Sequence, residues 1–197
     1  MNHRLVYVVG PSGAGKDSLL QWLLEHPPAC TRIHLARRTV TRAATAGGEG
    51  HEAVEASAFS ELLAAGAFSL HWSANGLHYG IRKQEFAALA TGAWVLVSGS
   101  RAHLPTAQER YPGLTAVHVH ASAGVLRQRL SLRGRETMAE VEARLHRALA
   151  FEPPAQAFCL TNDEDLASAG LRLKAHLFGR GSAGRSPHLG YVNPQVT

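Results

Sequence analysis

The sequence predicts an α/β fold in which a parallel β-sheet is covered by helices. Short apolar runs alternate with helical patterns along the chain, and the first apolar run ends in a glycine-rich turn that leads into a helix. Strands that alternate with helices are joined by crossover connections, which make the strands parallel. The chain has 197 residues, 45% of them hydrophobic, which suits one compact domain with a sizeable core.

The predicted elements follow one another in a regular order. Residues 5–9 (LVYVV) are a run of strand formers, and residues 18–24 carry the apolar face of a helix. Two further strands are expected at 93–97 and 114–119, and a last short one at 158–160. The helical patterns after these strands cover residues 102–110, 123–132, 139–150 and 163–178. We expect one domain at 1–178 and, because residues 179–197 are rich in Gly, Ser and Pro, a flexible C-terminal tail.

Composition narrows the classes of partner. The formal charge is +5, and only three of the 20 basic residues are Lys. Arginine favours bidentate contacts with phosphate, whereas no nucleic-acid recognition motif is present, so we expect no nucleic-acid partner. Cys30 and Cys159 lie far apart, which argues against a disulfide framework and favours a cytoplasmic location. No apolar run is long enough to cross a membrane, so no membrane partner is expected.

A glycine-rich loop follows the first predicted strand and matches the pattern GxxxxGK between a strand and a helix. Glycines allow backbone N–H groups to point at a phosphate, and the helix that follows adds the positive end of its dipole. The terminal lysine places a cation near the β- and γ-phosphates of a nucleotide, so we expect it to be catalytic as well. The sequence therefore predicts an ATP-binding loop formed by Gly10, Pro11, Ser12, Gly13, Ala14, Gly15 and Lys16.

The residue after Lys16 departs from the usual pattern. Ser or Thr commonly follows the lysine and binds Mg²⁺, whereas here Asp17 comes first and Ser18 second. Two interpretations stay open at this point. In the first, Asp17 contacts Mg²⁺ directly or through water, and Ser18 lies on the metal or on a phosphate of the nucleotide. In the second, Asp17 only stabilises the first turn of its helix by attraction to the helix dipole.

Clustered arginines follow the helix predicted at 123–132. Arg129 and Arg133 are four residues apart and share one face if the helix continues, and Gly134 is a helix stop or hinge. A helix–loop–helix of this kind resembles the mobile lid of nucleoside-monophosphate kinases, at about residues 129–138. The resemblance implies that Arg129 and Arg133 are catalytic and neutralise the transferring phosphoryl group. The structural alternative is a solvated basic helix face.

Further motifs resemble those of guanylate kinases over about residues 4–175. GPSGAGK, Thr41-Arg42, HWSANGLHYG at 71–80, RLSLRG and Thr161-Asn162-Asp163 occur in the order seen in that family. The resemblance implies a P-loop NTPase fold of the nucleoside-monophosphate-kinase type, with an acceptor-binding region at about 36–82. It also implies that Arg42 and Tyr79 bind the acceptor phosphate and that Asn162 lines the adenine pocket.

The groups that read guanine in that family are absent from this chain. Leu70 stands where the family has Glu, and no Asp or Glu occurs from residue 86 to 108, where the family places an Asp. A pocket that has lost the acceptors for guanine N–H groups loses discrimination for that base. The same gap removes the second carboxylate that commonly helps to hold Mg²⁺.

The departures themselves form a pattern. GKDSLL, EGHE at 49–52, HWSANGLHYG, VSGSRAHLP and RQRLxxRGRE resemble the ribose 1,5-bisphosphate phosphokinases of bacterial phosphonate catabolism. The resemblance implies transfer of a phosphoryl group from ATP to ribose 1,5-bisphosphate, which gives 5-phosphoribosyl 1-pyrophosphate (PRPP). An acceptor with two phosphates and no base needs cations and hydroxyls. The candidate acceptor ligands are Arg38, Arg42, Tyr79, Ser98, Ser100 and Arg101, with Glu49 or His51 on the ribose hydroxyls.

Two other functions stay open. One is a guanylate kinase or other nucleoside-monophosphate kinase, and the other is a non-catalytic interaction module of the guanylate-kinase type. The intact glycine loop argues against the module. The expected partner is a small sugar bisphosphate, and the sequence leaves the oligomeric state open, with a homodimer as one alternative.

Overall fold

The computed structural model describes residues 3–42, 50–134 and 137–179. Its central sheet has the strand order β2-β7-β1-β8-β9, and every neighbouring pair is parallel. The strands are β1 (Leu5–Val9), β2 (Ile33–Leu35), β7 (Trp94–Ser98), β8 (Thr115–His120) and β9 (Phe158–Thr161). The predicted parallel sheet is therefore confirmed, as are the four strands expected from the apolar runs.

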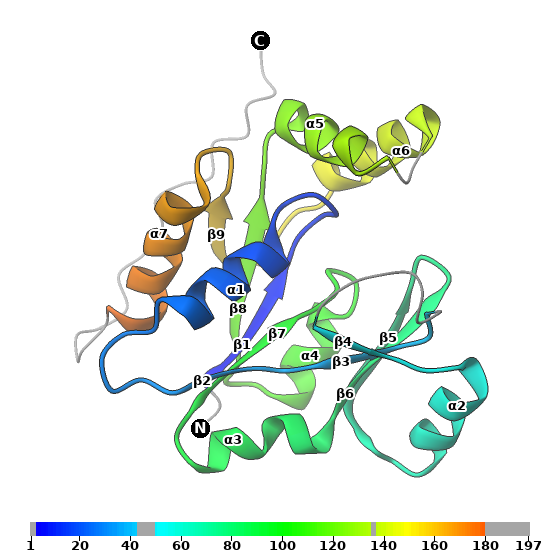
Figure 1. Ribbon diagram of the computed structural model, residues 1–197, viewed down its shortest axis with the longest axis vertical. Helices are drawn as coiled ribbons and strands as arrows, with labels where there is room; N and C mark the ends of the chain where they lie inside the picture. The colour runs from blue at the N-terminus through cyan, green and yellow to red at the C-terminus, as the bar shows by residue number, and fades with distance from the viewer. Residues whose placement is uncertain (1–2, 43–49, 135–136, 180–197) are drawn as a thin grey trace.

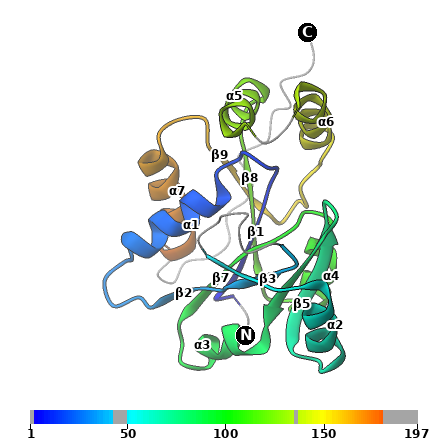
Figure 2. The ribbon, with the colours of Figure 1, turned by 45° about the vertical axis from the view of Figure 1, so that its right-hand side comes forward.

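Helices cover both faces of this sheet (Figures 1 and 2). Helices α1 and α7 lie together on one face, whereas α4 lies on the other, beside the second sheet. Their bounds are α1 (Lys16–Glu25), α3 (Ala87–Ala90), α4 (Leu104–Arg110), α5 (Ala123–Arg133), α6 (Met138–Leu149) and α7 (Leu166–Phe178). The helices predicted after the apolar runs are all present. None of the helices in the described ranges combines the length and apolarity that a bilayer crossing requires.

The strand β1 divides its side chains between two hydrophobic cores, because successive residues of a strand point to opposite faces. Val6 and Val8 belong to the core under α1 and α7, whereas Leu5, Tyr7 and Val9 belong to the core under α4. All five residues are fully buried. A strand buried on both faces reads as a continuous apolar run, which is why the sequence predicts it well.

A second sheet occupies the region expected to bind the acceptor. Its strand order is β4-β3-β6-β5, and it is mostly antiparallel. Its elements are β3 (Arg38–Val40), β4 (His51–Ala53), β5 (Phe68–Ala74) and β6 (Leu77–Arg82), with α2 (Ala56–Ala64) beside them. The sequence analysis expected only a parallel sheet and missed this one. The signal was the Asn75-Gly76 pair, which has positive φ at both residues and joins β5 to β6 as a tight hairpin turn.

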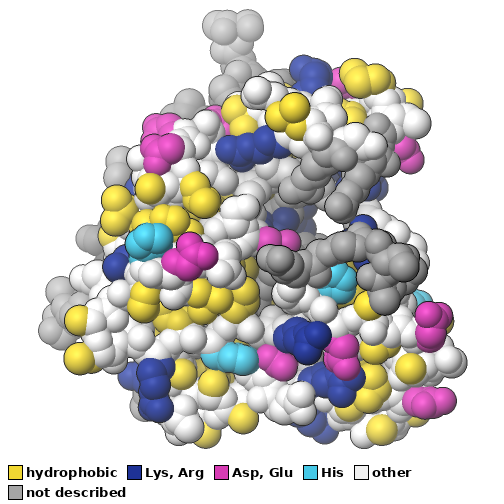
Figure 3. All heavy atoms as spheres, viewed as in Figure 1, with side chains coloured by type: hydrophobic (Ala, Val, Ile, Leu, Met, Phe, Trp, Pro, Cys, Tyr) yellow, Lys and Arg dark blue, Asp and Glu magenta, His cyan; other side chains and the backbone are white. Residues whose placement is uncertain are grey.

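Helices α5 and α6 project together from one end of the central sheet (Figure 1). The helix α5 ends at Gly134 with a φ of 60°, which confirms the predicted helix stop. Thr137 and Glu140 form a capping box that starts α6, and Arg127 pairs with Glu142 across the two helices. Figure 3 shows that the surface is hollowed between these helices and the four-stranded sheet.

Candidate active site

The glycine loop joins β1 to α1 at the carboxyl end of the central sheet. Gly10, Gly13 and Gly15 have φ values of 155°, 88° and 86°, which L side chains rarely adopt. A Cβ at Gly10 would lie 2.0 Å from the carbonyl oxygen of Val119, and one at Gly15 would lie 2.3 Å from the side-chain amide of Asn162. The backbone conformation and the close packing therefore both require glycine at positions 10 and 15.

The side chain of Lys16 lies against the loop that precedes it. Its Nζ donates hydrogen bonds to the carbonyl oxygens of Gly10 and Pro11, at 2.8 and 3.1 Å. Because Gly15 is the N-cap of α1, the ammonium group and the amino end of the helix act on the same small region. The loop thus gathers the cation, the glycine backbone and the helix dipole that bind a phosphate.

Asn162 directly follows β9 and hydrogen-bonds this loop. The side chain is 3% exposed, and its Nδ2 donates a 2.7 Å hydrogen bond to the carbonyl oxygen of Ala14. Its Oδ1 is buried and has no hydrogen-bond partner among the described residues. The structure therefore places Asn162 beside the glycine loop, and its Oδ1 is a buried polar atom without a hydrogen-bond partner among the described residues, while the predicted role in an adenine pocket stays a prediction.

Asp17 lies between the loop and the four-stranded sheet. Its Oδ1 accepts a 2.8 Å hydrogen bond from Ser98 Oγ, and its Oδ2 accepts one of 3.2 Å from Arg38 Nη2. A third bond of 3.3 Å runs from Arg38 Nη1 to Ser98 Oγ. Partial desolvation by the surrounding protein raises the pKa of the Asp17 carboxyl, but Arg38, Ser98 and Lys16 together hold it below its usual value. The carboxylate is therefore ionised, and Ser18 beside it is exposed.

An electropositive edge surrounds His51 on the four-stranded sheet. Arg38 lies directly opposite His51 in the β3–β4 register. Burial, and then Arg38, Arg42 and Arg37, lower the pKa of His51. The imidazole is thus neutral at physiological pH, within a field that favours a bound anion. Glu49, the other candidate for the ribose hydroxyls, lies outside the described residues.

The side chain of Tyr79 is part of an aromatic row. Its ring stacks against Trp72 at 5.5 Å between centroids, and Trp72 stacks against His103 at 5.3 Å. Trp72 is half-buried against the core under α4, so it acts mainly as core packing. Leu70, in the position that distinguishes this chain from guanylate kinases, is 3% exposed and belongs to the same core.

The candidate residues at the end of β7 and just after it lie in two regions, one beside the glycine loop and one beside α6. Ser98 contacts Asp17, and the backbone N–H of Ser100 donates to the hydroxyl of Tyr7. Arg101 lies against the end of α6 and the residues that follow it. Its Nη1 donates to the carbonyl oxygen of Arg147, and its guanidinium stands 5.0 Å from the ring centroid of Phe151. Arg101 therefore contacts the α6 side of the site, whereas Arg38 and Ser98 lie beside the loop.

Two arginines on α5 and α6 contact the glycine loop directly. Arg129 Nη1, on α5, donates to the carbonyl oxygen of Gly13 at 3.4 Å, and its predicted role in a lid stays a prediction. Arg144, on α6, donates from Nη1 to Ser12 Oγ at 3.0 Å. Arg144 was not predicted as a site residue, because it lies on α6, outside the arginine cluster around Gly134, and belongs to no motif. The side chain of Arg133 lies outside the described part of the structure.

One histidine beside the loop has an unusual environment. His118 is 5% exposed, and neither ring nitrogen has a hydrogen-bond partner among the described residues. Burial, then His120, Arg101 and Lys16, lower its pKa to about 4. His118 is therefore a neutral, buried group close to the cationic side chains of Lys16 and Arg101.

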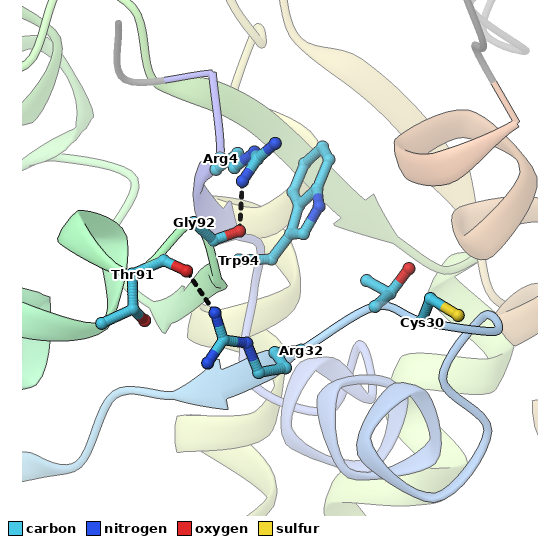
Figure 4. Close-up of a pocket in the computed structure, with 7 residues that line it drawn as sticks. Arg4, Cys30, Arg32, Thr91, Gly92 and Trp94 are labelled. Carbon is cyan, nitrogen blue, oxygen red and sulfur yellow. Dashed lines mark hydrogen bonds between the residues drawn. The ribbon is translucent and has the colours of Figure 1, made fainter.

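A cavity of about 300 Å³ lies away from these residues (Figure 4). Arg4, Arg32 and Trp94 line it, and they stand at the amino ends of β1, β2 and β7. The guanidinium of Arg4 donates to the carbonyl of Gly92, and that of Arg32 to the carbonyl of Thr91 (Figure 4). Because the glycine loop is at the carboxyl end of the sheet, this cavity is not part of the candidate active site.

Comparisons with known proteins find relatives that share much of this sequence. A ribose 1,5-bisphosphate phosphokinase PhnN from Azotobacter vinelandii is 51% identical over 147 residues, which cover 75% of this chain and 80% of the relative. One from Thiobacillus denitrificans is 43% identical over 171 residues, covering 86% and 90%. A relative of the same name from Laribacter hongkongensis is 46% identical over 174 residues, and there the chain spans only 42% of the relative's length.

The fold has a counterpart among solved structures. A guanylate kinase from Anaplasma phagocytophilum superposes with a TM-score of 0.61 at 18% sequence identity, covering 89% of this chain and 84% of that one. This likeness shows the P-loop kinase fold. No protein-family model matches the chain.

Proposed function

Because the chain belongs to the ribose 1,5-bisphosphate phosphokinase family, we propose that it transfers the γ-phosphoryl group of ATP to ribose 1,5-bisphosphate. The products are ADP and PRPP, and the reaction serves phosphonate catabolism. One observation carries the proposal: the intact glycine loop with Lys16 lies beside an edge of the four-stranded sheet that is rich in arginine. At position 70, where a guanine-binding carboxylate would be expected, the residue is the apolar Leu70.

The glycine loop and the arginines of the lid bind ATP, the phosphoryl donor. The backbone of residues 10–15 wraps the phosphates, and Lys16 exchanges its bonds to Gly10 and Pro11 for phosphate oxygens. Arg129 and Arg144 already contact the loop and neutralise the equatorial oxygens of the transferring group, together with Arg133. Asn162 contributes its unpartnered Oδ1 to the nucleotide pocket.

The residues beside the loop fit Mg²⁺. Asp17 is ionised and its side chain is 68% exposed, and the Ser18 hydroxyl lies next to it. We assign these two oxygen donors to the ion, Asp17 directly or through water, because hard cations take oxygen ligands and Mg²⁺ keeps several waters and phosphate oxygens. The described ranges contain no cluster of three or more His, Cys, Asp or Glu side chains that could hold a metal by themselves, so the other ligands of this ion would be water and phosphate oxygens. When bound, Mg²⁺ neutralises charge on the phosphates.

The acceptor half needs no general base, because the attacking oxygen belongs to an ionised phosphate. Catalysis therefore consists of positioning and charge neutralisation. Arg38, Arg42 and Tyr79 bind the acceptor phosphates, and His51, which is neutral, contacts a ribose hydroxyl together with Glu49. The hydroxyl of Ser100 is a further donor, Ser98 takes part through its hydrogen bonds with Asp17 and Arg38, and Arg101 supplies charge from the α6 side.

Replacing Arg42 by alanine is expected to weaken acceptor binding more than ATP binding. The side chain is half-buried beside Arg38 and His51, on the acceptor sheet rather than on the loop. Loss of one charged hydrogen-bonding group costs about 1.5–3 kcal/mol, so the KM for ribose 1,5-bisphosphate should rise about ten-fold or more. Steady-state kinetics with each substrate varied in turn measures this. Equal increases in both KM values would contradict the assignment.

Replacing Leu70 by glutamate is not expected to create a GMP kinase. The side chain at this position is buried in the core, so the new carboxylate would be desolvated, and the second guanine-reading carboxylate would still be missing. ADP release with GMP, measured on protein that keeps its circular dichroism spectrum, checks the prediction. Strong GMP turnover by this single variant would show that the acceptor pocket has been assigned wrongly.

The proposed reaction is tested by identifying its product. The purified chain is incubated with ATP, Mg²⁺ and ribose 1,5-bisphosphate, and phosphorus NMR follows the appearance of the diphosphate of PRPP. Formation of PRPP in step with ADP supports the proposal. ADP release without a diphosphate product would overturn it, since water or another group would then be the acceptor.

A further inference from the structure

We propose that Asp17 is a positioning residue for the acceptor phosphate: its carboxylate holds Arg38 so that the remaining N–H groups of Arg38 bind the acceptor. The inference rests on the proposed function and names a specificity determinant within the same site. It goes beyond the Mg²⁺ assignment, because it gives Asp17 a task that does not require the metal.

Asp17, Arg38 and Ser98 come from a helix, from a strand of the four-stranded sheet and from a strand of the central sheet. Asp17 lies on the first turn of α1, Arg38 begins β3 and Ser98 ends β7. Their hydrogen bonds of 2.8, 3.2 and 3.3 Å close a triangle. The nucleotide loop and the acceptor sheet are therefore joined by a side-chain contact that fixes the position of Arg38 relative to Lys16.

The geometry of Arg38 leaves donors for a ligand. A guanidinium carries five N–H groups in a rigid plane, so fixing two of them fixes the other three. Nη1 and Nη2 each donate one hydrogen to the triangle. Neither the side-chain hydrogen bonds nor the ion pairs of the described residues give Arg38 another acceptor, and the side chain is only 23% exposed. A phosphate oxygen is the acceptor that this arrangement suits.

A carboxylate is needed at position 17 for this arrangement. One oxygen receives Ser98 and the other receives Arg38, whereas a serine or threonine hydroxyl has a single oxygen and no charge to hold the guanidinium. A carboxylate also repels a doubly phosphorylated acceptor. Its removal should therefore tighten acceptor binding if Asp17 is only a nearby charge, and should weaken binding if it positions Arg38.

The test measures acceptor binding without the metal. Ribose 1,5-bisphosphate is titrated calorimetrically into the full chain in EDTA, with no nucleotide present. Asp17→Asn keeps an oxygen for Ser98 but loses the charge that holds Arg38, and we expect about five-fold weaker binding, the upper range for an exposed ion pair. Glu25→Gln, at the exposed far end of the same helix, is the matched control and should bind like the wild type.

Two further variants protect the result from misinterpretation. Ser98→Ala leaves both charges in place and should also weaken binding. In the double variant Asp17→Asn/Arg38→Ala, binding should be no weaker than in Arg38→Ala alone, because Asp17 acts through Arg38.

Unchanged or tighter binding by Asp17→Asn, or losses that add in the double variant, would overturn the positioning inference. Absence of binding by the wild type would instead overturn the proposed function and the inference that rests on it.

Discussion

Replacing Lys16 by alanine is expected to abolish phosphoryl transfer while leaving the fold intact. We propose that the ammonium group binds the β- and γ-phosphates, and no other side chain of the described residues hydrogen-bonds both Gly10 and Pro11. Removal of one such preorganised donor costs about 10²–10³ in kcat, and loss of a full charge from a triphosphate site adds to this. Coupled ADP release under saturating substrates measures the loss.

The matched control for this variant is Lys83→Ala. Lys83 is exposed at the start of a short 3-10 helix (Lys83–Phe86) next to the acceptor sheet and contacts no part of the glycine loop in the described structure. Its replacement should leave kcat within about two-fold of the wild type, because exposed substitutions away from the site have small effects. Turnover retained by Lys16→Ala, with a folded protein, would refute the assignment of the loop.

The second large effect is expected at Arg144. Its Nη1 donates to Ser12 Oγ from the helix α6, so it reaches the glycine loop, where we propose that it contacts the transferring phosphoryl group. We expect Arg144→Ala to lower kcat about 10²–10³-fold with a smaller change in the KM for ATP, since charge on the phosphoryl oxygens is neutralised mainly in the transition state.

Arg147 provides the comparison on the same helix. It lies one turn further along α6, is exposed, and bonds only locally to the carbonyl of Ala143 through its side chain. Arg147→Ala should keep nearly full activity, and Arg144→Lys should recover part of it, because lysine keeps the charge but loses the planar fork. Equal kinetic losses in Arg144→Ala and Arg147→Ala would show that the lid acts by general charge and not through Arg144.

The middle strands of the central sheet were predictable because they are buried on both faces, whereas the three half-buried residues of β2 were not predicted. Leu5–Val9 is a continuous apolar run, and the glycine loop after it has a fixed spacing that only a strand–loop–helix can satisfy. The four-stranded sheet was not predicted, since β3 and β4 have three residues each and show no usable periodicity. Only the Asn75-Gly76 turn marks its hairpin.

The candidate site was predictable to a similar degree. Lys16, Asn162 and Arg129 follow from motifs, and the structure brings all three to the loop. The partnership of Asp17 with Arg38 could not be predicted, because it joins the first turn of α1 to β3 of the four-stranded sheet and depends on how these two elements pack together. Arg144 escaped notice for a related reason: a single arginine on an amphipathic helix has no signature until the helix is placed beside the loop.

The central claim is that this kinase fold keeps its ATP-binding loop but lacks the carboxylates that would hydrogen-bond a purine acceptor. One competition assay tests this most directly: ADP release is measured with ATP and Mg²⁺ while ribose 1,5-bisphosphate and GMP are offered at equal concentrations, with product ratios read by chromatography. We expect PRPP to form almost exclusively. Brisk conversion of GMP to GDP, with the sugar bisphosphate left unchanged, would contradict the account.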